Sequence, residues 1–188
     1  MKKLAATASL AFALALVSGT AAEARPHPAG HNKSFVANKK FGLGLEIFDI
    51  FGLTGKYFIS ENSAIDFGFG EFGYYGWHDR YRGAGGLHMY GDWLYHPLSF
   101  TSNESFELPL YFGVGLRLWY YDYDYYDPRY DHDTLLGLRI PIGIAFDFNN
   151  VPLDLFIQVT PTFDFYHRYY DGFVGDVAFT VGMRYYFN

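Results

Sequence analysis

Cysteine is absent from this sequence, and lysine is almost absent beyond the first forty residues. Without cysteine, the chain cannot be a disulfide-stapled secreted scaffold. Lys56 is the only lysine after Lys40, whereas soluble β-proteins commonly use lysine to keep strand edges and outer faces hydrated. The formal net charge of −6 argues against a nucleic-acid partner. The scarcity of lysine therefore calls for an explanation other than an ordinary soluble surface.

Long apolar runs are also missing, apart from a short one near the start. The chain opens Met-Lys-Lys, is mostly apolar from Leu4 to Val17 and then reaches small residues that end at Ala24. The apolar run is too short to span a membrane as a helix. A basic start, a short apolar stretch and a small-x-small site are typical of a secretory signal peptide. We therefore expect residues 1–24 to be a signal peptide that directs export.

Residues 25–40 have a composition of their own. They are rich in proline, glycine, histidine and lysine, which is typical of an exposed, flexible N-terminal tail. No Gly/Ser linker divides the remainder of the chain. Residues 41–188 are therefore expected to form one domain.

What the sequence has in quantity is glycine, aromatic residues and a strict alternation of residue types. The last stretch, residues 176–188, places Val177, Phe179, Val181, Met183, Tyr185 and Phe187 on one face, with small or polar residues between them. A period of two predicts a β-strand. Seven earlier segments alternate in the same way: residues 41–49, 53–60, 64–73, 87–96, 110–121, 136–147 and 153–165. No segment has a competing helical period, so we predict an all-β chain of eight strands.

The connections between these segments fall into two sets. Residues 60–63 and 149–152 are tight turns, with residues 97–107 a longer exception on the same side. The other set consists of a short connection, residues 49–52, and three long, aromatic and charged loops, residues 74–86, 122–134 and 166–172. Short turns at one end and longer loops at the other are typical of outer-membrane barrels, and strands can cross lipid only in a closed ring. We therefore predict an eight-stranded antiparallel up-and-down transmembrane β-barrel.

The size of the side chains predicts which face points inward. The apolar faces carry mainly Leu, Ile, Val and Phe, whereas the opposite faces are rich in Gly, Ala and Thr. The lumen of an eight-stranded barrel is only wide enough for side chains to fill it, so the small residues fit inside and the bulky ones face lipid. Charges on a lipid-facing surface cost about 2–4 kcal/mol at the midplane, which explains the scarcity of lysine. Residues near strand ends suit interfacial aromatic girdles; they are Tyr57, Tyr95, Tyr120, Tyr121 and Tyr185.

With this orientation the interior collects charged side chains, which must be paired and hydrogen-bonded. The predicted interior network is Glu46, Lys56, Asp66, Asp92, Arg117, Arg139, Asp154, Asp164, Asp176 and Arg184. We expect it to close the barrel as a salt-bridged plug; an ion-conducting pore is the alternative, although eight strands leave little room for water. Pro141 and Pro161 fall within predicted strands, where we expect bulges or missing hydrogen bonds.

Residues 122–133 form the densest acidic stretch. Closely spaced carboxylates could bind Ca²⁺, but the stretch lacks the glycine and the distal glutamate of an EF-hand loop. Its tyrosine-rich composition suits a surface loop that contacts protein or glycan. We favour the surface-loop interpretation and predict no metal or other cofactor.

Histidine offers only a weak hint of catalysis. His88, Asp92 and His96 share one strand face at four-residue steps, which places neighbours roughly 13 Å apart and too far to hold one metal ion. His78 and His167 lie in predicted loops. A catalytic base of this kind would need a nucleophile such as serine beside it, and no serine is near either histidine in the sequence. We predict that the protein is not an enzyme.

The end of the chain carries a resemblance to known proteins. Residues 181–188, VGMRYYFN, resemble the terminal-strand signature that the outer-membrane assembly machinery reads, with Val181, Met183 and Tyr185 on the apolar face and Phe187 as the aromatic anchor; Asn188 after it is a departure. The overall plan is similar to that of the OmpA transmembrane domain and OmpX. Residues 53–61, 64–70, 108–115 and 151–156 resemble a family of small bacterial outer-membrane barrels with no established catalytic residues.

The resemblance implies an outer membrane of the Gram-negative type, with membrane lipids and the assembly machinery as partners. Three functions follow as hypotheses. The first is a non-enzymatic outer-membrane barrel that holds surface loops for envelope structure or contact. The second is an outer-membrane enzyme that modifies lipid. The third is a soluble, secreted ligand-binding barrel.

Overall fold

The computed structural model describes residues 30–72, 85–122, 133–165 and 173–187. Within these ranges the chain contains strands and no helix, which confirms the predicted all-β class. The strands are β1 (Gly30–Lys33), β2 (Phe41–Phe48), β3 (Ile50–Phe58), β4 (Ser63–Phe72), β5 (Gly85–Ser102), β6 (Phe106–Asp122), β7 (Asp133–Arg139), β8 (Ile142–Phe148), β9 (Leu153–Phe165) and β10 (Phe173–Phe187). The predicted signal peptide, residues 1–24, lies outside the described residues.

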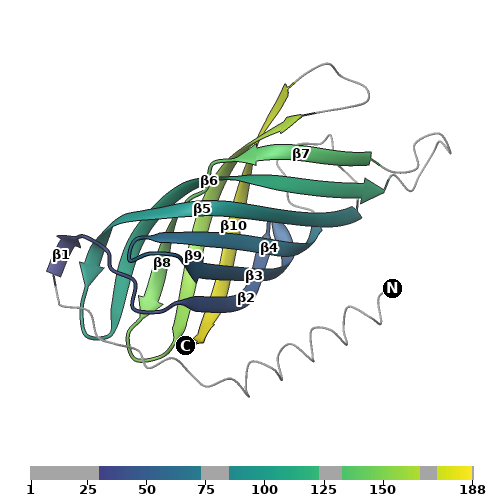
Figure 1. The fold of residues 1–188 in the computed structure, drawn as a ribbon. Coiled ribbons are helices and arrows are strands. Elements are labelled where there is room, and N and C mark those ends of the chain that lie inside the picture. The colour runs from purple at the N-terminus through teal and green to yellow at the C-terminus, as the bar shows by residue number, and fades with distance from the viewer. Residues whose placement is uncertain (1–29, 73–84, 123–132, 166–172, 188) are drawn as a thin grey trace.

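The ten strands form one antiparallel sheet that closes into a ring (Figure 1). β2 to β6 pair in chain order. β7 and β8 each pair with both β6 and β9, and β10 pairs with both β9 and β2. The ring closes where Phe187 lies opposite Phe41 and Thr180 opposite Phe48. Closure leaves none of β2 to β10 with a long unpaired edge, which is the usual hazard of an exposed sheet.

The two ends of the ring differ in their connections. One end, called the turn end below, has the connections at residues 59–62, 103–105 and 149–152 and the start of β2. The opposite end, called the loop end, has Asp49 between β2 and β3 and the strand ends that adjoin residues 73–84, 123–132 and 166–172. Those three segments contain most of the predicted surface loops and lie outside the described residues.

One predicted connection is much shorter than expected. The sequence predicted a long link over residues 97–107, but β5 continues to Ser102 and β6 already begins at Phe106. Register shifts between Tyr95 and Leu98 and between Ser99 and Ser102 accommodate Pro97 within the strand, as β-bulges commonly do. Asn103 then closes the turn, because its side-chain oxygen accepts hydrogen bonds from the backbone N–H groups of Ser105 and Phe106 at 2.8 and 2.9 Å.

Pro141 interrupts the predicted strand over residues 136–147 and divides it into β7 and β8. Arg139 lies opposite Thr162, and Ile142 lies opposite Val159. Both strands advance by three residues between these two pairs, so the interruption inserts no extra residue. Neighbouring hydrogen bonds also survive, from Ile140 N–H to the carbonyl of Pro161 at 2.9 Å. The sequence predicted either a bulge or a missing hydrogen bond at Pro141. The structure shows no bulge, and the sheet lacks only the hydrogen bond that a backbone N–H at residue 141 would donate.

Residues 30–40 differ from the exposed tail that their composition predicted. β1 pairs with the turn-end extension of β5, with His31 opposite Thr101. The side chains of Phe35 and Lys39 are buried, at 3% and 4% exposure. The composition carried no information about the contacts that these two side chains make with the ring.

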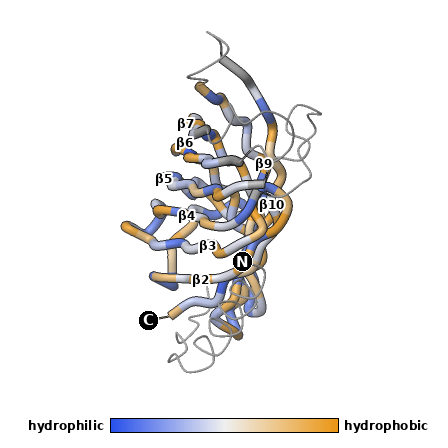
Figure 2. The backbone as a smooth tube through the Cα atoms, turned by 90° about the vertical axis from the view of Figure 1, so that its right-hand side faces the viewer, coloured by the Kyte–Doolittle hydropathy of each residue, from blue (hydrophilic) through white to orange (hydrophobic). Residues whose placement is uncertain are grey.

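The two faces of the sheet have opposite chemistry. Large apolar side chains are exposed on the outside of every strand of the ring. Apolar and polar residues alternate along the strands (Figure 2). Charged and small side chains are buried on the inside. Ile142 and Phe179 are 49% and 43% exposed, whereas Arg117 and Arg139 are almost fully buried. The predicted orientation of the apolar and polar faces therefore agrees with the structure.

Candidate functional site: the charged interior of the ring

The interior of the ring gathers side chains from all its strands. Every member of the predicted interior network except Asp176 is buried. Asp176 is half-buried near the loop end, where its carboxylate accepts a hydrogen bond from the N–H of Val177 at 2.7 Å. Other buried polar residues were not predicted, and they include Lys39, Asp49, Tyr90, Glu107, Tyr111, Asp147 and Tyr186. The buried groups form three layers along the axis of the ring.

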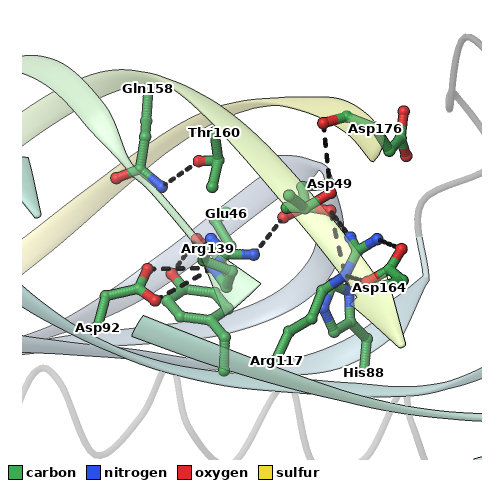
Figure 3. A network of polar contacts seen from close by, with 12 residues as sticks. Glu46, Asp49, His88, Asp92, Arg117, Arg139, Gln158, Thr160, Asp164 and Asp176 are labelled. Atoms are coloured by element: carbon green, nitrogen blue, oxygen red, sulfur yellow. Dashed lines mark hydrogen bonds and ion pairs between the residues drawn. The ribbon is translucent and has the colours of Figure 1, made fainter. Parts of the chain in front are cut away.

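The layer nearest the loop end is centred on Asp49 and is called the Asp49 cluster (Asp49, Asp92, Arg117, Arg139 and Asp164; Figure 3). Arg139 donates from Nη1 to Asp49 Oδ2 at 2.8 Å and from Nε to Asp92 Oδ2 at 3.1 Å. Arg117 donates from Nε to Asp164 Oδ1 at 2.8 Å, and its Nη1 lies 4.0 Å from Asp49 Oδ1. Two guanidinium groups thus share three carboxylates, as buried charges require.

Asp49 enters this cluster through a distortion of the backbone at Phe48. In β2 the even-numbered residues Gly42, Gly44 and Glu46 are buried, so simple alternation would place residue 48 inside and residue 49 outside. Phe48 has a φ of 86°, its side chain is exposed, and the following carboxylate points inward. Sequence alternation missed Asp49 because a single residue in this unusual conformation reverses the order of the faces.

Tyr90 links Arg139 to Glu46. The guanidinium carbon of Arg139 lies 3.9 Å from the centre of the Tyr90 ring, a cation–π arrangement. The Tyr90 hydroxyl donates to Glu46 Oε2 at 2.9 Å. His88 lies on the other side of the cluster, with its Nδ1 3.9 Å from Asp49 Oδ1. His88 and Asp92 are therefore parts of a buried polar network, of which the sequence predicted Asp92, and His96 is in a different layer.

The middle layer is centred on Arg184 and is called the Arg184 cluster (Thr54, Asp66, Asp154, Phe156 and Arg184). Arg184 Nη2 lies 2.8 Å from Asp66 Oδ1, and Nη1 lies 3.9 Å from Asp154 Oδ2. Its Nε lies within hydrogen-bonding distance of Thr54 Oγ1 at 3.3 Å. The guanidinium group stacks on the Phe156 ring at 3.8 Å. A single arginine from β10 thereby joins β3, β4 and β9 across the interior.

The third layer, at the turn end, is mostly aromatic and is called the aromatic layer (Phe35, Phe58, His96, Tyr111 and Tyr186). The centres of neighbouring rings in this layer lie 5.0 to 6.4 Å apart. Lys56 Nζ sits over the rings of Tyr111 and Phe58 at 4.8 and 5.1 Å. The predicted ion pair for Lys56 is not found, since no carboxylate of the described residues lies within 4 Å of Nζ; the aromatic faces stabilise the charge instead.

The glycines of the inner face make room for these layers. A Cβ atom added at Gly137 would lie 2.2 Å from Asp164 Oδ1, and one at Gly115 would lie 2.0 Å from Asp92 Oδ1. Both distances are far below contact distance, so a larger residue would displace the carboxylates that pair with arginine. The predicted use of glycine inside a crowded ring therefore has a direct structural reason.

The described residues contain no group of three or more His, Cys, Asp or Glu side chains placed to hold a metal ion. They also contain no helix that is long and apolar enough to cross a membrane. The acidic stretch, residues 122–133, and the histidines at positions 78 and 167 fall almost wholly outside the described ranges. What the interior arrangement does chemically is to neutralise charge and fill space.

Comparison of the chain with protein families, with curated proteins and with solved structures found no match. The resemblance of residues 181–188 to a terminal-strand signature therefore stays a prediction. In the structure, Val181, Met183, Tyr185 and Phe187 lie along β10, which closes the ring against β2.

Proposed function

We propose that this chain is an integral outer-membrane β-barrel of eight strands with a closed interior, and that it acts in envelope structure or in contact at the cell surface without catalysing a reaction. The strand count treats β7 and β8 as one strand, because they keep the same register against both neighbours. It leaves β1 out, because β1 pairs only with the extension of β5.

The observation that carries the proposal is the outer surface of the ring. Large apolar side chains are exposed on every strand, for example Leu116 at 53%, Ile157 at 49% and Val177 at 54%. Soluble monomers rarely expose continuous apolar patches of more than a few hundred Å². A surface that is apolar around a whole ring, with the charges inside, suits hydrocarbon chains rather than water.

The lengths of the strands fit this environment. With β7 and β8 counted as one strand and β1 left out, the strands range from eight residues in β2 to 18 in β5, and a tilted strand of about 9–11 residues crosses the hydrocarbon core. Aromatic residues gather on the outer face near the turn end, where Tyr57 contacts Phe41 at 6.4 Å and Tyr95 contacts Phe112 at 5.8 Å between ring centres. These positions suit the interface between lipid and water.

The predicted signal peptide and terminal strand give the proposal its location and partners. Export followed by recognition of β10 by the outer-membrane assembly machinery would deliver the chain to the outer membrane. The turn end would then face the periplasm and the loop end the outside. The tyrosine-rich stretches beyond the loop end suit contacts with protein or glycan.

Folding into lipid vesicles tests the proposal. The mature chain should refold with phospholipid vesicles, float with them in a density gradient and run as a faster band on gels when it is not boiled. A chain that folds and stays monomeric in buffer without lipid or detergent would refute the membrane assignment and support a secreted soluble barrel.

A single outward substitution makes the test sharper. Val159 lies on the outer face near the middle of β9 and is 44% exposed. In a bilayer, Val159→Arg should lower the free energy of unfolding by about 2–4 kcal/mol. On a water-exposed surface the same change should alter it by about 0.5 kcal/mol or less. Val159→Leu is the matched control and should be close to neutral in both cases.

A further inference from the structure

Residues 35–39 cross the turn end of the ring between two opposite parts of its wall. On one side, the N–H of Ala37 donates to the carbonyl of Glu61 in the β3–β4 turn at 2.7 Å. On the other side, Lys39 contacts Asp147 of β8. Two strands, β5 and β6, lie between β8 and β4 along the ring. The chain comes from β1 beside the end of β5 and leaves into β2 (Figure 1). The segment is therefore attached at several points around this end.

Phe35 is the apolar anchor of the segment. Its ring lies 5.8 Å from that of Phe58 and 5.0 Å from that of His96, and it packs in one buried cluster with Ala64 and Tyr186. All four partners belong to the ring and face its interior. The side chain thus completes the aromatic layer from outside the sheet.

Lys39 is the charged anchor. Its Nζ forms an ion pair with the carboxylate of Asp147 and donates to the carbonyl of Phe148 at 2.7 Å. It also lies 5.4 Å from the centre of the Tyr186 ring. The neighbouring residues Val36 and Lys40 point outward and are exposed. Phe35 and Lys39 are thus the two fully buried side chains of the segment, and Ala37 packs against the same cluster while partly buried.

We propose that residues 35–39 are a stopper that closes the turn end of the interior. In the proposed outer-membrane orientation this is the periplasmic mouth, but the inference rests on the contacts alone and holds in any solvent. The stopper covers Ala64, which is fully buried, and it separates the aromatic layer and the Lys56 charge from the surrounding water. Closure at this end is thereby independent of the Asp49 cluster.

The absence of native cysteine allows a clean accessibility test. A single cysteine at Ala64→Cys reports on the space beneath the stopper, and its reaction with a charged, membrane-impermeant thiol reagent is measured in the folded full-length mature protein. In the otherwise unchanged chain the reaction should be slow. Adding Phe35→Gly and Lys39→Gly should accelerate it by about tenfold or more, because local opening then no longer limits access.

The same segment supplies the matched control. Val36→Gly with Lys40→Gly removes two side chains of the same types that point outward, and it should leave the reaction rate within about twofold. A cysteine at Thr160→Cys, buried on β9 away from this end, should stay slow in every variant. Equal acceleration in the stopper variant and the control, or at both cysteines, would refute the proposal.

If the double glycine variant does not fold, a third variant tests whether residues 35–39 close the turn end. Asp147→Asn weakens the ring-side partner of Lys39 without altering the segment, and it should accelerate labelling of Ala64→Cys by several-fold. No acceleration in this folded variant overturns the proposal. The readout is separate from membrane insertion, because folded protein can be labelled in detergent or in buffer alike. A failure here would leave the flotation result unchanged.

Discussion

At the scale of single residues, burial distinguishes the charges that stabilise this ring from those that do not. Asp164 and Asp176 lie on neighbouring strands and both belong to the predicted interior network. Asp164 is fully buried and accepts a hydrogen bond from Nε of Arg117, whereas Asp176 is half-buried and its carboxylate accepts a hydrogen bond from the N–H of the next residue, Val177. The same amino acid should therefore have very different energetic weight at the two positions.

Matched substitutions test this difference. Asp164→Asn leaves the Arg117 charge without a carboxylate of the described residues at hydrogen-bonding distance, and it should lower the free energy of unfolding by about 3–5 kcal/mol. Asp176→Asn should cost less than about 1 kcal/mol. Urea titration of the protein in detergent micelles, followed by tryptophan fluorescence, measures both. Similar losses for the two variants would contradict the assignment of Asp164 to a buried ion pair.

Inner-face glycine provides a second test at this scale. Gly137→Ala places a methyl group 2.2 Å from Asp164 Oδ1 and should destabilise the fold by about 1–3 kcal/mol through overpacking. Gly91→Ala, on the outer face of β5 with no atom within 4 Å of the added Cβ, should be neutral or slightly stabilising. The two midpoints of urea unfolding should separate clearly, and coincident midpoints would show that the interior has spare room.

At the scale of elements, the conformation of Phe48 decides how β2 ends. The unusual φ of this residue turns its ring outward, where it lies 5.6 Å from the Phe179 ring, and turns Asp49 inward. Replacing Phe48 by either glycine or alanine removes the ring contact. Only alanine keeps the steric penalty of a positive φ, which is about 1–2 kcal/mol for a residue with a Cβ atom.

We therefore expect Phe48→Gly to be more stable than Phe48→Ala by about 1 kcal/mol. This order is the reverse of the usual one, since glycine inside a regular strand is less stable than alanine by about 0.5–1 kcal/mol. Thermal or urea unfolding of the two variants side by side gives the difference. Alanine as the more stable variant would indicate an ordinary backbone at residue 48.

The strands themselves were largely predictable, and their deviations have local causes. Alternation located the segments that became β2 to β10, because burial of one face imposes a period of two over many residues. It misjudged the connection at residues 97–107, where β5 continues through a bulge beyond Pro97. It also did not detect β1, since four residues without alternation carry too little signal.

At the scale of the whole molecule, three layers of side chains follow one another along the interior of the described part of the ring. The Asp49 cluster, the Arg184 cluster and the aromatic layer leave the charges paired or stacked. The described part of the ring therefore resembles the packed lumen of a narrow barrel more than a water-filled channel.

Planar-bilayer recordings test closure of the whole ring. The unmodified protein should insert without producing a large steady conductance, because paired arginines and carboxylates occupy the cross-section in two separate layers. Replacement of Arg139 by alanine in one layer should leave the lumen closed, since the Arg184 cluster still fills it. Steady pore-like currents from the unmodified protein would overturn the closed-interior proposal.

The sequence by itself determined the class of the elements, the positions of most strands and the face on which each side chain lies. These properties depend on neighbours two residues apart, so they can be read along the chain except where a single residue such as Phe48 reverses the order of the faces. Only the tertiary structure decided that Arg139 joins Asp49 to Asp92, that Arg184 meets Asp66, and that Lys39 and Phe35 close the turn end. These partners come from strands far apart in the sequence, and their meeting depends on how strand register and ring closure align the inner faces.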